Sequence, residues 1–242
     1  MTRIWGDLHV HTVASGHGYS TVLENARVAL RKGLRVLGVA DHSPSMPGGP
    51  SPLYFEAKGH FPREIEGVRI YFGAEVDVVD FDGKLDLEDR ILRKLDFVIV
   101  SFHPQVFRGG SREENTDALL RALENPFVDI VAHPGNPRFP LDYNKLVEEA
   151  VGRGKILEIN NSSFLPTSSR ESAYGFDFEI ACLIHEKRLL TILSSDAHIH
   201  THVGMVDRAS ELAEEAGIVP EQVLNTSVLK VLEYLAARRS QR

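Results

Sequence analysis

The sequence predicts an α/β fold in which parallel strands alternate with helices and close into a barrel. Seven short apolar runs rich in β-branched residues recur along the chain, and helical patterns lie between them. This order is typical of parallel sheets wrapped by helices, whose strands are buried on both faces. An open, doubly wound sheet is the alternative, but no glycine-rich phosphate loop follows the first run, which favours the barrel.

The predicted strands are residues 4–10, 35–40, 68–76, 97–101, 129–132, 156–159 and 189–194. The predicted helices are residues 21–32, 112–123, 145–151, 176–186, 207–216 and 227–238. The first helix has clear end signals, because Thr21 and Glu24 match a capping box and Gly33 follows its last turn.

The chain is expected to form a single domain, residues 1–242, because α/β barrels routinely use this length for one core. No internal repeat, low-complexity tract or linker divides it. The longest irregular stretch, residues 43–67, holds five prolines. It is a candidate lid, since loops of this length in compact domains are usually functional or partly disordered.

Composition and charge exclude several classes of protein. Hydrophobic residues make up 43% and charged residues 25%, which is ordinary for a soluble globular chain. No apolar run reaches the roughly 20 residues of a membrane helix, and the first residues carry no signal-peptide core, so a cytoplasmic location is expected. The net charge of −7 argues against a general binder of nucleic acid. The lone Cys182 is expected to be a small buried hydrophobe.

Metal-binding types of side chain follow nearly every predicted strand. In chain order they are His9, His11, His42, Glu75, His103, His133, Asp196 and His198. The sixth strand instead ends in Asn160 and Asn161. In a parallel barrel the carboxyl ends of the strands share one rim, where barrel enzymes place their chemistry. These side chains are therefore expected to converge.

Spacing within this set indicates a metal site. His9 and His11 are two residues apart on a strand, so both point to one face and can chelate one ion; Asp196 and His198 repeat the device. His17, flanked by glycines, can reach the rim from a mobile loop. A single histidine after a strand is more often a hydrogen-bonded residue than a ligand. Seven histidines and two carboxylates on one rim, however, would be costly to bury without a cation.

The number of candidate ligands predicts more than one ion. A zinc-type ion takes roughly four or five ligands, so nine protein ligands overfill one site and nearly saturate two. Three divalent ions, with Glu75 as a bridge, would leave positions open for water or substrate. Imidazole-rich sites with few carboxylates and no thiolate suit zinc, manganese or iron, and zinc is the first expectation.

Six short segments resemble the polymerase and histidinol phosphatase (PHP) superfamily. They are DLHVHT at residues 7–12, ADHS at 40–43, GAE at 73–75, SFHP at 101–104, AHPGNP at 132–137 and SSDAH at 194–198. They span nearly the whole chain in fixed order, and the chain is similar to the single-domain YcdX-like branch. The resemblance implies a distorted seven-stranded TIM-like barrel with three metal ions at its C-terminal rim, and hydrolysis of phosphate esters. It also implies that all nine family ligand positions are occupied: His9, His11, His17, His42, Glu75, His103, His133, Asp196 and His198.

The expected reaction is hydrolysis of a phosphomonoester by a metal-bound hydroxide, because an ion cluster lowers the pKa of bound water toward ~7 and neutralises phosphate charge. Glu75 and Asp196 are the catalytic carboxylates in this hypothesis. No Gly-x-Ser-x-Gly elbow is present to supply a protein nucleophile. The candidate substrate-binding residues are Arg170, Arg138, Asn160, Asn161 and Ser162.

Two aspartates that precede ligand positions, Asp7 and Asp41, are expected to orient an imidazole from behind. The remaining histidines, His60, His185, His200 and His202, are not expected to be ligands, although His200 and His202 lie close enough to His198 in sequence for a role at the rim.

Three other functions fit parts of the pattern. A phosphodiesterase or nuclease would use the same metals, but the acidic net charge and the absence of polymerase modules count against nucleic acid. An amidohydrolase also uses a first-strand His-x-His and a last-strand Asp, but commonly needs a carboxylated lysine that no predicted strand offers. A non-catalytic metal-binding module would keep the same ligands. The expected partner is a small phosphorylated molecule, and a homo-oligomer is compatible with the sequence.

Overall fold

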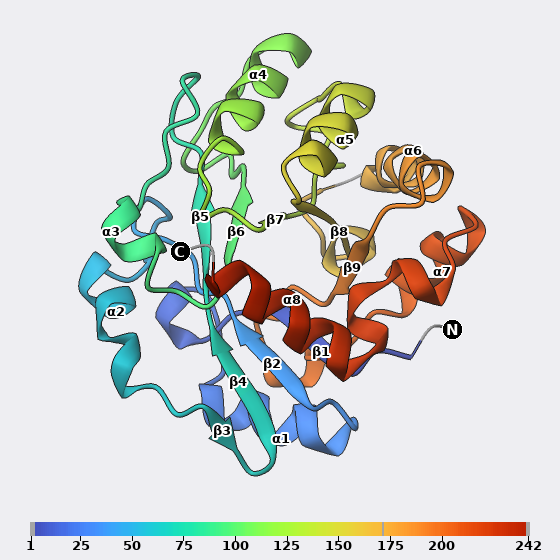
Figure 1. The fold of residues 1–242 in the computed structure, drawn as a ribbon. Helices are drawn as coiled ribbons and strands as arrows, with labels where there is room; N and C mark the ends of the chain where they lie inside the picture. Colours follow the sequence, from blue (N-terminus) through green and yellow to red (C-terminus); the bar gives the residue numbers. More distant parts are fainter. Residues whose placement is uncertain (1–2, 171, 241–242) are drawn as a thin grey trace.

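The computed structural model describes residues 3–170 and 172–240, whose strands form two sheets around a shared interior (Figure 1). The first sheet has the order β1–β2–β4–β3 and contains β1 (Gly6–Val10), β2 (Val36–Val39), β3 (Glu64–Ile65) and β4 (Val68–Phe72). The second has the order β5–β6–β7–β8–β9 and contains β5 (Ala74–Asp77), β6 (Val98–Ser101), β7 (Ile130–Val131), β8 (Ile156–Asn160) and β9 (Thr191–Ser194). Neighbouring strands are parallel, apart from the antiparallel pair of β3 and β4.

Every predicted strand region contains a strand, but the third one, residues 68–76, is divided between the two sheets. β4 ends at Phe72 and β5 begins at Ala74, so Gly73 lies at the break. A Cβ atom on Gly73 would lie 2.6 Å from the ring of Phe97. Glycine therefore lets the chain pass this ring while it changes from one sheet to the other.

The pairing does not close into the predicted seven-stranded barrel. In the described residues, isolated bridges join the sheets where their edges meet: Val10 pairs with Ala197, and His42 pairs with Glu75. Regular pairing gives way to single bridges at both seams. At the first seam the backbone is bent, since Asp196 adopts a φ of 53° directly before Ala197.

Helices surround the strands on the outside (Figure 1). They are α1 (Val22–Arg31), α2 (Pro52–Glu56), α3 (Asp89–Leu92), α4 (Arg112–Ala122), α5 (Tyr143–Gly152), α6 (Ala173–Glu186), α7 (Asp207–Glu215) and α8 (Val228–Ser240). The predicted capping box at the start of α1 is present between Thr21 and Glu24. Cys182 on α6 is half-buried. Within the described ranges, no helix combines the length and apolarity needed to cross a bilayer.

The amino end of the strands is covered by α8, which Figure 1 shows crossing the molecule in dark red. Val231 and Leu235 of α8 belong to the same buried cluster as Leu8, Ile99 and Ile130 from the strands. This end of the interior is closed by apolar packing, which leaves the carboxyl ends of the strands for a site.

The stretch predicted to be irregular, residues 43–67, is more ordered than the sequence indicates. It contains α2, β3 and the short 3-10 helix η2 (Ala57–His60). Two of its side chains anchor it to the rest of the fold, since the Tyr54 hydroxyl donates to Asp41 at 2.6 Å and the Lys58 ammonium donates to Asp96 at 2.9 Å. The role of this stretch as a lid stays a prediction.

Candidate metal centre

The rim side chains predicted from the sequence gather around the carboxylate of Glu75 on β5. Glu75 Oε2 lies 2.8 Å from His42 Nδ1 and 3.4 Å from the Nε2 atoms of His9 and His11. Its other oxygen, Oε1, lies 3.0 Å from His133 Nε2 and 3.5 Å from His103 Nε2. Residues from separate strand ends thus meet at one carboxylate, as the convergence of parallel strands requires.

Three overlapping groups in the described residues have ligand atoms within 4.8 Å of one another. They are His9, His11 and Asp196; His11, His42 and His198; and His42, Glu75 and His103. His133 joins through its contact with Glu75. The ring of His17, on an exposed loop, stacks on the rings of His42 and His198 at centroid distances of 4.9 and 4.7 Å. The structure therefore brings all nine predicted side chains together.

Several buried polar atoms at this centre have no hydrogen-bond partner. They include His42 Nδ1, Glu75 Oε2 and His198 Nε2. The first two are 2.8 Å apart but lack hydrogen-bond geometry. Leaving such atoms unpaired in a protein interior costs about 1–3 kcal/mol each. Imidazole nitrogens and carboxylate oxygens that converge without pairing fit divalent cations of the zinc, manganese or iron type.

The charge balance of the cluster also fits cations. Burial lowers the pKa of His17, His103 and His133 to about 4, so these imidazoles are neutral at neutral pH, as coordination requires. Burial opposes ionisation of Glu75 and Asp196, yet the facing imidazoles hold the pKa of both carboxylates well below its usual range.

His9 shows the complementary effect within the same cluster. Burial opposes its charged form, but Glu158, Asp196 and Glu75 together raise the pKa of His9 well above its usual value. The carboxylates therefore create a region that favours positive charge.

A second layer of side chains orients the imidazoles. Glu158 Oε1 lies 2.8 Å from His9 Nδ1, and Asp77 Oδ1 lies 2.9 Å from His103 Nδ1. Contacts of this kind fix which ring nitrogen faces the site. Neither Glu158 nor Asp77 is among the side chains that the sequence predicts for this role. The sequence could have indicated Glu158, because it is the single charged residue in the apolar run of β8, where a carboxylate without a partner would be costly to bury.

The two aspartates predicted to orient imidazoles act differently. In the described residues, the Asp7 carboxylate accepts hydrogen bonds from the hydroxyl and amide of Ser195 and from the amides of Gly204 and His9, and it contacts no imidazole. This prediction was wrong because Asp7 points to the neighbouring loop. Asp41 reaches an imidazole only through Ser15. The Asp41 carboxylate accepts from the Ser15 hydroxyl at 2.7 Å, and Ser15 Oγ lies 3.0 Å from His11 Nδ1.

Two residues of the cluster have a backbone conformation that side chains other than glycine rarely adopt. His133 has a φ of 32° and Asp196 a φ of 53°. Such conformations cost on the order of 1–3 kcal/mol and persist where the surroundings enforce them, often at functional sites. Here the strain coincides with two of the nine side chains.

A cavity of about 420 Å³ opens over the cluster. Of the predicted substrate-binding residues, Arg138, Ser162 and Arg170 line it. Arg170 Nη2 donates to Asp196 Oδ2 and to Ser162 Oγ, both at 2.7 Å, so its charge is held beside the cluster. The other two predicted residues, Asn160 and Asn161, are not among the residues that line this cavity. Asn160 is fully buried and donates to Asp196 at 3.2 Å, whereas Asn161 Oδ1 accepts from the backbone amides of Arg208 and Ala209 at the start of α7.

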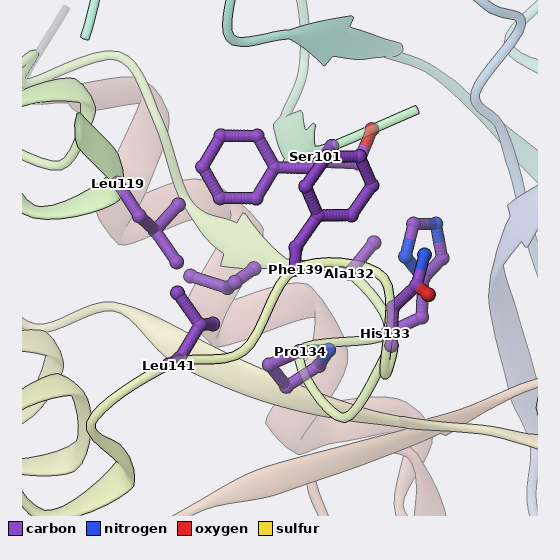
Figure 2. Close-up of a pocket in the computed structure, with 10 residues that line it drawn as sticks. Ser101, Leu119, Ala132, His133, Pro134, Phe139 and Leu141 are labelled. Atoms are coloured by element: carbon purple, nitrogen blue, oxygen red, sulfur yellow. The ribbon is translucent and has the colours of Figure 1, made fainter. Parts of the chain in front are cut away.

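A second, much smaller pocket lies behind His133. Figure 2 shows its labelled apolar lining, including Leu119, Phe139 and Leu141, on the side away from the imidazole of His133. Its volume of about 10 Å³ is that of a single water probe, which is too small for a substrate. Its residues pack beside the His133 turn, and the cavity over the cluster is the larger of the two.

Comparisons with known proteins agree with this centre. A probable phosphatase of Caldanaerobacter subterraneus subsp. tengcongensis is 46% identical over 238 residues, which cover 98% of this chain and 93% of the relative. One from Thermoanaerobacter sp. strain X514 is 44% identical, over 96% of this chain and 95% of the relative. The fold is similar to that of a histidinol phosphate phosphatase from Lactococcus lactis, solved with zinc, L-histidinol and phosphate. The TM-score is 0.59 at 18% identity, over 88% of this chain and 94% of that one.

The family model of the PHP domain matches residues 7–162, which include seven of the nine clustered side chains, as far as His133, and exclude Asp196 and His198. The high identity to the full-length relatives extends the match over the remainder of the chain. The chain belongs to the PHP domain family.

Proposed function

We propose that this protein is a metal-dependent phosphatase that hydrolyses a small phosphomonoester with three divalent ions at the rim. The observation that carries the proposal is the convergence of imidazole and carboxylate atoms on Glu75, several of them buried and unpaired. Two comparisons support phosphate-ester hydrolysis with bound metal. Relatives similar over most of their length are named probable phosphatases, and a histidinol phosphate phosphatase of similar fold was solved with zinc and phosphate.

In this proposal nine side chains hold the ions: His9, His11, His17, His42, Glu75, His103, His133, Asp196 and His198. Zinc fits the donor set, and manganese and iron are the alternatives. Bound divalent ions acidify water and neutralise charge that builds up on a phosphoryl group. Glu75 lies within 3.5 Å of nitrogen atoms from several strand ends, so its two oxygens suit a bridging position.

The cavity supplies groups for the phosphate. The Arg170 guanidinium is buried, fixed by Asp196 and Ser162, and presents a planar cation at the cavity wall, which suits phosphate oxygens. Arg138 is exposed on the same wall and can bind a second anionic oxygen. Asn160 donates to Asp196 and thereby holds the carboxylate that anchors Arg170.

Phosphate release from an aryl phosphate tests the proposal. Protein loaded with Zn²⁺ or Mn²⁺ should release inorganic phosphate, and removal of the ions by a chelator should abolish the activity. An inert protein with full metal content would contradict the enzyme and favour a non-catalytic metal-binding module. Turnover of diesters with no turnover of monoesters would favour a phosphodiesterase.

A further inference from the structure

His202 lies on the wall of the substrate cavity and belongs to no part of the proposed metal centre. It ends the 3-10 helix η4 (His200–His202), four residues after His198. Its side chain is exposed, and no hydrogen bond or ion pair of its imidazole is found in the described part of the chain. The neighbouring His200 differs, because its Nδ1 lies 3.0 Å from Ser20 Oγ.

The backbone that carries His202 is held on both sides of the residue. The Lys32 ammonium on α1 donates to the carbonyl oxygens of Thr201 at 2.9 Å and Val203 at 2.7 Å. The amide of His200 donates to Ser20 Oγ at 2.8 Å. An imidazole without a protein partner in the described residues therefore lines, from a fixed turn, the cavity where the substrate would bind, an arrangement that suits a reacting group.

The other ionisable side chains that line the cavity have different roles or chemistry. His17, His42, His103, Asp196 and His198 belong to the metal cluster, so their free electron pairs are used. Arg138 and Arg170 keep their protons. Tyr19 remains, but imidazoles are the commonest proton donors in enzymes that work near neutral pH. Among the described lining residues, His202 is thus the group best suited to supply a proton.

We propose that His202 is the catalytic acid that protonates the leaving oxygen of the phosphoester; this inference rests on the proposed function. A water oxygen forms the new bond to phosphorus while the ester oxygen leaves with the bonding electron pair. That oxygen takes the proton of the His202 imidazolium and departs as an alcohol. The proton lost by the water returns to the imidazole, directly or through solvent, so the products are the alcohol and inorganic phosphate.

Two substrates that differ in their leaving group test this assignment. Nitrophenolate leaves without protonation, whereas an alkoxide does not, so 4-nitrophenyl phosphate and 2-phenylethyl phosphate are compared on metal-loaded full-length protein. In His202→Gln, kcat/KM for the alkyl ester should fall by about 10²-fold or more, and that for the nitrophenyl ester by less than about threefold.

Matched histidine variants serve as controls. His200→Gln, in the same turn, and His60→Gln, on the far exposed η2, should leave the ratio of the two kcat/KM values as in the wild type. Equal losses of both substrates in His202→Gln, or no loss, would overturn the assignment, because a binding or structural role does not distinguish leaving groups. A selective loss in Tyr19→Phe with none in His202→Gln would assign the proton to Tyr19 instead. Wild-type protein that hydrolyses neither substrate would overturn the proposed function itself.

Discussion

The two ends of the strands bury charge in different ways. At the amino end, Asp129 is fully buried, and its carboxylate accepts from the Val98 amide and from Arg238 Nε, both at 2.7 Å. At the carboxyl end, Glu75 is equally buried, but Oε2 and the facing His42 Nδ1 have no hydrogen-bond partner. A fully paired carboxylate stabilises a fold, whereas a buried carboxylate oxygen and a buried ring nitrogen that face each other without a hydrogen bond indicate a place where something else binds.

Non-glycine residues with positive φ occur at both ends, but their places differ. At the carboxyl end they include His133 and Asp196 of the cluster, whereas at the amino end Glu66 and Arg188 lie in the connections that lead into β4 and β9. At the amino end, α8 packs regular helical side chains on the strands, and Tyr234 donates to the Asp129 carbonyl at 3.1 Å. We infer that packing at the amino end stabilises the fold. This stabilisation offsets the cost of the strained and unpaired groups that the carboxyl end keeps for function.

Removal of the central charge should give the largest effect. In Glu75→Gln, kcat/KM for an aryl phosphate should fall by about 10³-fold or more, because several kcal/mol of stabilisation by bound ions is lost. Metal content, measured by elemental analysis, should fall in parallel. Glu88→Gln, at an exposed carboxylate, is the matched control. Wild-type metal content and activity in Glu75→Gln would contradict the central place of this carboxylate.

Breaking the ion pair at the amino end should instead affect stability. Arg238→Met leaves Asp129 buried without its cation and should lower the free energy of unfolding of the metal-free protein by about 3 kcal/mol. Metal content per folded molecule should not change. Arg239→Met, one residue along α8 and half exposed, should cost far less. Loss of metal from folded Arg238→Met would show that the two ends are not separate in function.

The second layer at the carboxyl end should give an intermediate effect. Glu158→Gln keeps the shape of the side chain but removes the charge that faces His9 Nδ1 at 2.8 Å. Metal affinity should fall by about 10–100-fold, as measured by competition with a chelator. Exposed Glu148→Gln should bind metal as the wild type does. Unchanged affinity in Glu158→Gln would contradict a role in metal binding and leave Glu158 only its hydrogen bonds with the His133 amide and the Asn160 side chain.

The sequence was sufficient to predict that the nine side chains gather, because all of them except His17, which lies on a loop, are at or near the carboxyl ends of strands that must converge. It was not sufficient to predict the side chains that orient these residues or the break in the third strand. The pairing of Glu158 with His9 joins residues 149 positions apart, and only the arrangement of the two sheets around a shared interior brings them together. The division of the third strand at Gly73 depends on the ring of Phe97, which directly precedes β6. Likewise, the place of Asp7 two residues before His9 indicates a contact with an imidazole, but its carboxylate accepts hydrogen bonds from Ser195 and Gly204 instead.

An effect on stability alone, and only within a limited pH range, is expected at Asp177 on α6, which accepts from the Gly135 amide at 3.1 Å. Burial raises the pKa of Asp177 to about 7, although nearby Arg170 opposes the shift. Since its pKa is about 4 when unfolded, the folded state holds the extra proton between these values, and stability falls as pH rises from about 4 to 7.

Asp177→Asn cannot lose that proton and should remove this slope. Its free energy of unfolding, compared with the wild type, should rise by about 1 kcal/mol per pH unit between pH 5 and 7 and level off above. Chemical denaturation at several pH values measures this difference. Parallel stability curves for the two proteins would contradict a raised pKa at this position.

Metal stoichiometry tests the central claim most directly. Protein reconstituted with Zn²⁺ and freed of excess ion should contain three ions per chain by elemental analysis, and the content should fall below about pH 6 as protons compete for the imidazoles. One ion per chain at neutral pH, or none, would contradict a centre built from nine side chains around Glu75.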